Sequence, residues 1–164
     1  MSNKIIYKKG DLISAFLDQE NPVNIIAHQC NCFCNFGKGI APQIKKRIPE
    51  AYHEDMKTIK GDKAKLGTLS LANTENGIVF NIYGQYGYWP KKDGGINTEY
   101  SALQSAFKQM ANLLLYSLYE KDCKKVIGLP KLGCGLGGGD WNIVSKIIEE
   151  ELCDKGFTVY VYEL

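Results

Sequence analysis

The sequence predicts a single α/β domain in which helices cover both faces of a mixed sheet, a three-layer α/β/α arrangement. Apolar, β-branched runs alternate along the chain with segments of helical periodicity. Two glycine-rich loops each lie between an expected strand and an expected helix. The 164 residues contain no repeat, linker or low-complexity tract, so one domain over 1–164 is expected. Alternating strands and helices are typical of the α/β class.

The first half of the chain predicts two strands followed by a helix. The strands are "KIIYKKGDL", ended by Gly10–Asp11, and the β-branched run "PVNIIAHQC". Segment 40–59 follows, with apolar or aromatic residues four apart, which is helical spacing: Ile40, Ile44, Ile48 and Tyr52. Pro49 should end or kink this helix near Ile48.

The second half predicts a hairpin, a loop, two helices and two more strands. Segment 67–84 reads as two strands around a turn at Glu75–Asn76–Gly77, because Asn-Gly is a strong hairpin signal. Segment 85–97 is expected to be a loop. A helix over 98–121 should bury Leu103, Phe107, Met110, Leu114 and Leu118. Segment 124–152 reads as strand, glycine loop and helix, and 157–164 as a final strand.

Composition points to a soluble protein of the cytoplasm. Hydrophobic residues make up 45% and charged residues 23%, and the net charge of +2 is too small to indicate nucleic acid or an anionic membrane as a partner. The N-terminus does not resemble a signal peptide, and no apolar run approaches the roughly 20 residues that span a bilayer. The six cysteines are therefore expected to be reduced thiols.

The stretch "HQCNCFCNFGKG", 28–39, resembles a metal site at first sight. In a straight strand at about 3.3 Å per residue, His28 and Cys34 would be roughly 20 Å apart, too far to share one zinc ion. None of the cysteines forms a C-x-x-C pair. We therefore expect no metal and no cofactor, and the three cysteines are expected to pack as small apolar residues.

The two glycine loops, "NFGKG" at 35–39 and "GCGLGGGD" at 133–140, are better explained by phosphate binding. Glycine lets the backbone approach a ligand, so that successive N–H groups point at one anion, and a following helix N-terminus adds partial positive charge. Two such loops favour a ligand with more than one phosphate, or with a phosphate and a sugar. The spacings do not fit a P-loop, and the acidic strand end of a dinucleotide fold is missing.

The order of motifs resembles a macrodomain, the ADP-ribose-binding fold, over essentially the whole chain. The matching segments are "KGDL", "IIAHQCN", "FGKGIAPQI", "GLPKLGCGLGGGDW" and "TVYVYEL". Within that family the chain is most similar to the ADP-ribose-1″-phosphate phosphatases and the related terminal ADP-ribose hydrolases. The resemblance implies a mostly parallel sheet, a monomer, and ADP-ribose or its 1″-phosphate as ligand. A nucleic acid would be a partner only as an ADP-ribosylated substrate.

The resemblance also assigns binding residues. It implies that Asp11 and the Leu12 backbone bind the adenine edge, and that Asn31 reaches the distal ribose. The first loop would lie along the pyrophosphate and distal ribose through Gly37, Lys38, Gly39 and Ile40. The second loop would wrap the pyrophosphate through Gly133, Cys134, Gly135, Leu136, Gly137 and Gly138. Tyr162 and Leu164 would pack near the adenine.

The leading hypothesis is a metal-independent phosphatase acting on ADP-ribose-1″-phosphate. Its expected catalytic residues are His28 as general acid or base, Asp140 to orient or deprotonate water, and Asn31. A core position for His28 and helix capping by Asp140 are the structural alternatives. The tyrosines and tryptophan of 83–89 form either a lid on the ribose or an ordinary packed loop.

Two rival functions stay open. One is a hydrolase that removes ADP-ribose from protein or nucleic acid, and the other is a non-catalytic ADP-ribose-binding module. Macrodomains that use an acidic residue after the first glycine run have Asp where this chain has Ala41. The terminal hydrolases use a lysine and an aspartate at positions that align with Gly84 and Gly137. The resemblance therefore implies that the lysine-dependent chemistry is absent.

Overall fold

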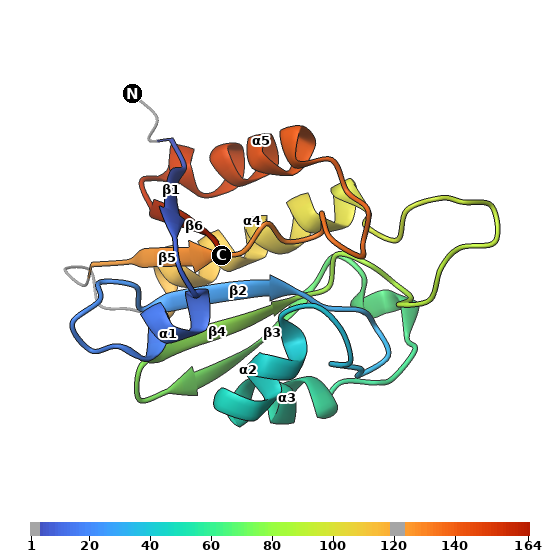
Figure 1. Cartoon of the computed structure of the whole chain (residues 1–164), viewed down its shortest axis with the longest axis horizontal. Coiled ribbons are helices and arrows are strands. Elements are labelled where there is room, and N and C mark those ends of the chain that lie inside the picture. Colours follow the sequence, from blue (N-terminus) through green and yellow to red (C-terminus); the bar gives the residue numbers. More distant parts are fainter. Residues whose placement is uncertain (1–3, 119–123) are drawn as a thin grey trace.

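One six-stranded sheet organises the chain, in the order β1-β6-β5-β2-β4-β3 (Figure 1). The computed structural model describes residues 4–118 and 124–164. In it β3 pairs antiparallel with β4, and the other neighbouring strands pair in parallel, so the expected mixed, mostly parallel sheet is confirmed. The strands are β1 (Ile6–Lys9), β2 (Ile25–Gln29), β3 (Leu69–Thr74), β4 (Gly77–Ile82), β5 (Val126–Leu129) and β6 (Thr158–Glu163).

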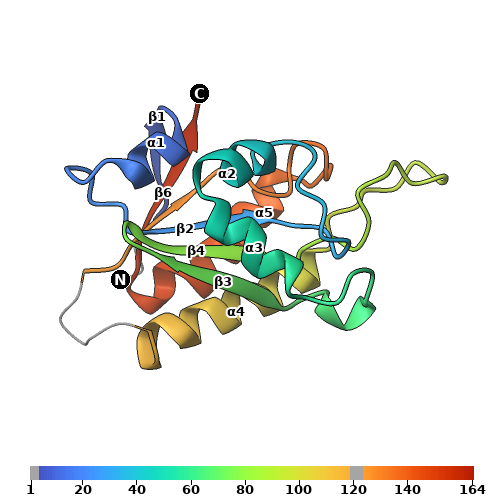
Figure 2. The ribbon, with the colours of Figure 1, turned by 90° about the horizontal axis from the view of Figure 1, so that it is seen from below.

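Helices cover both faces of this sheet, which makes the predicted three layers (Figures 1 and 2). One layer contains α4 (Tyr100–Tyr116) and α5 (Trp141–Glu151). The other contains α1 (Leu12–Leu17), α2 (Ala41–Arg47) and α3 (Pro49–Met56). Two short 3₁₀ helices, η1 (Lys63–Lys65) and η2 (Cys153–Lys155), complete the described elements.

Each face of the sheet supports its own apolar core, because successive side chains of a strand point to opposite faces. Along β2, Ile25 and Ala27 pack against the α4–α5 layer, whereas Ile26 packs against the α1–α3 layer. The central strands are thus buried on both sides, as their continuous apolar runs require. The expected stripe of α4 is buried through Leu103, Phe107, Met110 and Leu114, with Leu118 partly buried against the same core.

Local signals in the sequence account for most element boundaries. Pro49 begins α3 directly after Ile48, so the predicted 40–59 helix is divided there into α2 and α3. The Asn76–Gly77 signal is confirmed by the β3–β4 hairpin, in which Gly77 has a φ of 141°. The helix expected over 98–121 covers Tyr100–Tyr116, and 119–121 lie outside the described residues.

The sequence analysis missed α1. This helix has six residues, and Asp11 caps it by accepting a hydrogen bond from the Ile13 N–H at 3.2 Å. Asp11 is therefore a helix cap as well as a predicted ligand residue.

The carboxyl ends of the parallel strands meet at one edge of the sheet, and the loops 30–40, 83–99 and 130–140 gather there (Figure 1). Ligands of open α/β sheets bind at this edge. No helix within the described residues is long and apolar enough to cross a membrane.

Candidate functional site

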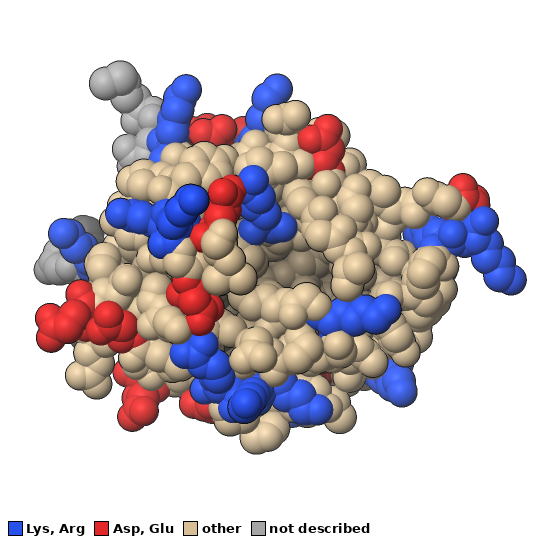
Figure 3. All heavy atoms as spheres, viewed as in Figure 1, with Lys and Arg blue, Asp and Glu red and all other residues tan. Residues whose placement is uncertain are grey.

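A cleft of about 230 Å³ opens at the carboxyl edge of the sheet, between the two glycine loops. The face in Figure 3 is hollowed near its centre, mostly among uncharged residues. Eight of the predicted binding residues line the cleft: Asn31, Lys38, Gly39, Ile40, Gly133, Gly135, Leu136 and Gly137. The two loops, about 100 residues apart in the chain, therefore form one site, as the glycine pattern predicts.

The first loop is shaped by its own asparagine side chains. The Asn31 amide oxygen accepts from the Phe33 N–H at 2.9 Å, and its amide nitrogen donates to the Asn35 carbonyl at 2.9 Å. The Asn35 side chain in turn accepts from the Gly37 N–H at 3.0 Å. The following N–H groups of Lys38 and Gly39 bond to no acceptor among the described residues, so they are available to a ligand.

In the second loop, the carbonyl oxygen of Gly133 accepts two hydrogen bonds. Gly133 O accepts from the Gly139 N–H at 2.7 Å and from the Thr98 hydroxyl at 2.7 Å. Gly133 and Gly138 have φ values of 78° and 75°, a conformation that favours glycine. Between them, the N–H groups of Gly135, Leu136 and Gly137 have no acceptor in the described part of the chain. Successive unpaired N–H groups in a glycine loop can bind an anion.

The charge of the cleft also favours an anion. No Asp, Glu or His is among the lining residues, and the two charged ones are Lys38 and Lys131. Lys131 is paired with Glu163 at 2.6 Å, and this hydrogen bond raises the pKa of the lysine. Lys38 is exposed and forms no ion pair with any described residue. A pyrophosphate would therefore find one uncompensated cation and two rows of N–H donors.

His28 does not reach the cleft. Its side chain is 1% exposed, packs edge-on against Phe36 at 5.1 Å, and has Nε2 at 2.7 Å from the Asn81 amide oxygen. Burial lowers the pKa of His28 to about 4. This position argues against the predicted general acid or base and agrees with the alternative, a core histidine. The physical reason is that the central strand β2 has no face open to solvent.

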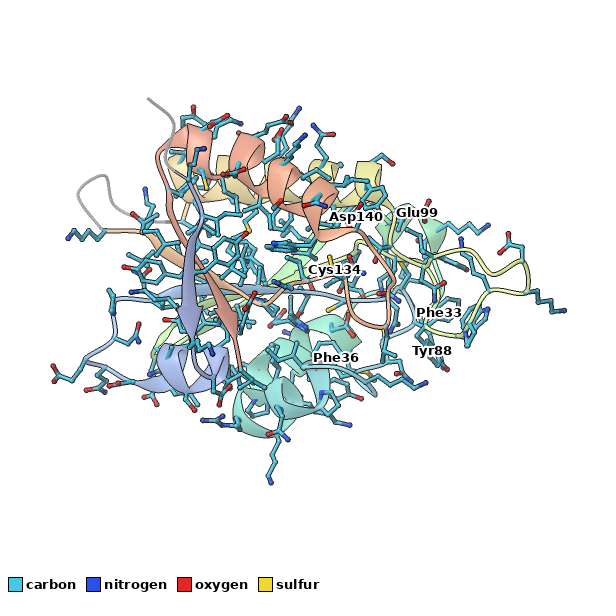
Figure 4. The ribbon with its side chains drawn as sticks, turned by 45° about the horizontal axis from the view of Figure 1, so that its top comes forward. Phe33, Phe36, Tyr88, Glu99, Cys134 and Asp140 are labelled. Atoms are coloured by element: carbon cyan, nitrogen blue, oxygen red, sulfur yellow. The ribbon has the colours of Figure 1, made fainter. Side chains whose placement is uncertain are left out.

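Asp140 also lies outside the cleft lining. It lies at the beginning of α5, whereas Phe36, which lines the cleft, lies beside α2 (Figure 4). The Asp140 carboxylate accepts from the Asn142 N–H at 2.9 Å, so the capping alternative is confirmed. Its main-chain N–H donates to the Tyr100 hydroxyl at 2.9 Å. A role in activating water remains a prediction.

The predicted adenine residues lie beyond the cleft as well. The Asp11 carboxylate accepts from the Ser14 hydroxyl at 2.7 Å and from Arg47 at 2.9 Å, and these bonds lower its pKa. The Leu12 side chain is buried, Tyr162 is half-buried and Leu164 is fully exposed. The remaining predicted loop residues, Gly37, Cys134 and Gly138, belong to the two loops but do not line the cleft.

Two glutamines that the sequence does not point to also line the cleft, together with Tyr88 of the aromatic segment 83–89. Gln29 lies at the end of β2, Gln85 begins the 85–97 loop, and Tyr88 reaches the cleft from that loop. Phe33 packs against Tyr86 at 4.9 Å and Trp89 at 5.1 Å, beside Tyr88 (Figure 4). Gln29 directly follows His28 in β2, and neighbouring side chains of a strand point to opposite faces. The sequence does not show which of these two side chains lines the cleft.

Two of the three cysteines of the opening stretch belong to the core, as expected, whereas Cys34 is half-buried and its thiol donates to Asp55 O at 3.4 Å. Cys30 and Cys32 are buried among the apolar residues of the α1–α3 layer. Burial raises the pKa of Cys30 well above its usual value and that of Cys32 to about 11. Among the described residues, no three His, Cys, Asp or Glu side chains are grouped as metal ligands.

Comparison with known proteins identifies the fold. The family model described as "Macro domain" matches residues 27–148. The chain belongs to the macrodomain family. This confirms the resemblance recognised in the sequence.

Three relatives show which known proteins this chain is similar to in sequence. An "Uncharacterized 17.5 kDa protein in tk-vs intergenic region" of Enterobacteria phage T4 is 34% identical over 87% of this chain and 86% of its own length. An "ADP-ribose 1''-phosphate phosphatase" of Debaryomyces hansenii is 28% identical over 89% of this chain and 93% of its own. The human "ADP-ribose glycohydrolase OARD1" is 27% identical over 96% and 91%. Two of these macrodomain relatives are therefore named as hydrolases of ADP-ribose compounds.

A solved structure agrees with the fold. The macrodomain protein from Streptomyces coelicolor superposes with a TM-score of 0.69 at 28% identity, covering 98% of this chain and 99% of that one.

This macrodomain has glycine at the two positions where the resemblance places a lysine and an aspartate in terminal hydrolases, and neighbouring side chains lie close to both. A Cβ atom on Gly84 would collide with the Gln29 Oε1 and would lie 2.6 Å from Leu103 Cδ2. A Cβ atom on Gly137 would collide with the Thr98 hydroxyl and would lie 2.9 Å from Gly133 O. Gln29 and Thr98 fill the positions at which a lysine and an aspartate would begin.

Proposed function

We propose that this macrodomain binds ADP-ribose and removes phosphate from ADP-ribose-1″-phosphate without a metal. The observation that carries the proposal is that two loops place unpaired main-chain N–H groups and one unpaired lysine around a single cleft. The N–H groups of Gly135, Leu136 and Gly137 would bind the pyrophosphate. Lys38, on the opposite loop, would face the phosphates from the other side.

The proposed chemistry is transfer of the terminal phosphoryl group to water, which yields ADP-ribose and inorganic phosphate. Such reactions are accelerated mainly by positioning and by stabilising charge on the phosphoryl oxygens. Lys38 and the loop N–H groups are suited to both tasks, and neither needs an acid or base in the cleft. Asn31 contributes as a positioning residue, since its side chain shapes the first loop.

A specific observation supports the phosphatase over a lysine-dependent glycohydrolase. The side chains of Gln29 and Thr98 occupy the space beside Gly84 and Gly137, so the lysine–aspartate chemistry has no counterpart there. Another observation favours a second candidate, a non-catalytic ADP-ribose-binding module. The cleft lining contains no Asp, Glu or His that could transfer a proton.

The test measures ADP-ribose binding by calorimetry and phosphate release from ADP-ribose-1″-phosphate in EDTA. The variants are Lys38→Ala and, as a matched control, Lys46→Ala, an exposed lysine of α2 outside the cleft. The phosphatase predicts release by the wild type and a loss of kcat/KM of about tenfold or more in Lys38→Ala alone, the scale of one charged hydrogen bond. Binding without release would leave the binding module, and absence of binding would contradict both candidates.

A further inference from the structure

The second glycine loop is attached to the rest of the cleft through a small hydrogen-bonded group of Gln29, Gln85 and Thr98. Gln29 ends β2, Gln85 follows β4, and Thr98 lies two residues before α4. The Gln29 amide nitrogen donates to Gln85 Oε1 at 2.7 Å and to the Thr98 hydroxyl at 2.9 Å. One side chain thus connects the end of a central strand to both ends of the 85–98 loop.

Thr98 is also hydrogen-bonded to the second glycine loop. Its hydroxyl donates to Gly133 O at 2.7 Å, and its main-chain N–H donates to Gly137 O at 3.1 Å. Gly133 O is the carbonyl on which the loop also closes, through the Gly139 N–H at 2.7 Å. The Thr98 side chain is 3% exposed, so these bonds are shielded from water.

Two further details concern the surroundings of this group. The Gln29 Oε1 is buried and has no partner in the described part of the chain, and an unsatisfied buried acceptor destabilises a fold. In addition, Gly84, Gly133 and Gly137 have no side chain where Gln29 and Thr98 come close.

We propose that Gln29 and Thr98 clamp the second glycine loop in its phosphate-binding shape, and that Thr98 is a positioning residue for the pyrophosphate. The affinity part of this proposal rests on the proposed function, because it concerns the same cleft. The Thr98 hydroxyl fixes Gly133 O, and Thr98 N–H fixes Gly137 O. These two contacts bracket the N–H groups of Gly135, Leu136 and Gly137 that remain unpaired.

The test compares Thr98→Val, which removes the hydroxyl and keeps the shape, with Thr98→Ser, which keeps the hydroxyl. A matched control is Thr74→Val at the β3–β4 turn. The Thr74 hydroxyl also donates to a glycine carbonyl, Gly77 O at 2.8 Å, and also accepts an N–H, from Asn76 at 3.1 Å. The control therefore loses a bond of the same kind outside the cleft.

The first readout needs no ligand. Amide hydrogen exchange of the bonded N–H groups of Gly138 and Gly139, followed by NMR, should become about 3- to 10-fold faster in Thr98→Val, the factor that corresponds to one hydrogen bond. Thr98→Ser and Thr74→Val should leave exchange in that loop within twofold of the wild type. Equal exchange in Thr98→Val and the wild type would overturn the clamp, whatever the protein binds.

The second readout is the dissociation constant of ADP-ribose and the split between KM and kcat on ADP-ribose-1″-phosphate. Thr98→Val should raise the dissociation constant and KM about 3- to 10-fold with kcat within twofold, and Thr98→Ser should restore both. Unchanged affinity beside faster loop exchange would overturn the positioning role. A wild type that binds no ADP-ribose would contradict the proposed function, while the exchange data would still decide the clamp.

Gln29→Met supplies a second variant if Thr98→Val does not fold. It removes the bonds to Thr98 and Gln85 but leaves the Thr98–Gly133 bond in place. Faster exchange of the Gly138 and Gly139 N–H groups would support the clamp, and exchange equal to that of the wild type would contradict it.

Discussion

Acidification should destabilise this macrodomain through His28, whose imidazole is buried as the neutral form. The Asn81 amide nitrogen donates to Ala51 O at 2.9 Å and to the Ser70 hydroxyl at 3.0 Å, so its oxygen faces His28. His28 Nε2 therefore carries the proton and donates to that oxygen at 2.7 Å. A second proton would have to go to Nδ1, inside the core.

The sign and size of the effect follow from the two pKa values. The pKa of His28 is lowered from 6.5 to about 4 by burial. Between these values the unfolded chain binds a proton that the folded chain does not, so stability falls as the pH drops from 6.5 to about 4. The two pKa values differ by about 2.5 units, and each unit corresponds to about 1.36 kcal/mol. The free energy of unfolding should therefore fall by about 3 kcal/mol.

Urea unfolding of the wild type and His28→Gln at several pH values between 4 and 8 measures this contribution. The wild type should lose about 3 kcal/mol more than His28→Gln over that range. Asp55, whose pKa is raised by burial, acts in both proteins and cancels in the difference. The matched control is His53→Gln, because His53 is the second of two histidines and is exposed on α3. Parallel pH profiles of the wild type and His28→Gln would refute the reasoning.

Three further substitutions test the fold and the cleft. Tyr83→Phe should lower the free energy of unfolding by about 1–3 kcal/mol, because the Tyr83 hydroxyl donates to the buried Asp55 carboxylate at 2.6 Å; urea unfolding measures it. Gly77→Ala should cost at least about 2 kcal/mol by the same assay, since its φ is 141° and the new Cβ would collide with Asn24 O. Tyr88→Ala should weaken ADP-ribose binding about 3- to 10-fold in calorimetry and leave the midpoint of unfolding unchanged, because this ring lines the cleft but is 43% exposed.

The sequence predicts the architecture well because its strongest signals are local. Pro49 divides the helical segment after Ile48, and the Asn76–Gly77 pair marks the hairpin turn where the structure has it. The sequence does not reveal the helix α1, because this helix is too short to give a clear local signal. Its six residues make fewer than two turns, too few for an apolar period to become visible, and its cap, Asp11, reads equally well as the end of a strand.

The sequence predicts the glycine loops of the candidate site and two of its polar side chains, Asn31 and Lys38, but not Gln29, Gln85 or Thr98. Glycine runs report directly on conformation, and both loops do line the cleft. The orientation of His28 and Gln29 depends instead on which layer packs against each face of β2, which strand alternation alone does not reveal. Thr98 had no signal at all, because its role comes from contacts with Gly133 and Gly137 that lie more than 30 residues away.

The polar groups of this domain are divided between two places with different tasks. The side chains with strongly shifted pKa values, which include His28, Tyr83 and Cys153, are buried in or beside the two apolar cores, and burial is the main cause of each shift. The cleft contains side-chain amides, unpaired N–H groups and the exposed lysine Lys38. Shifted pKa values often mark an active site, but here they mark the core. A cleft of this composition binds by geometry and fixed charge, so the precision with which Gln29 and Thr98 hold the second loop should matter more to ADP-ribose than the protonation state of any one residue.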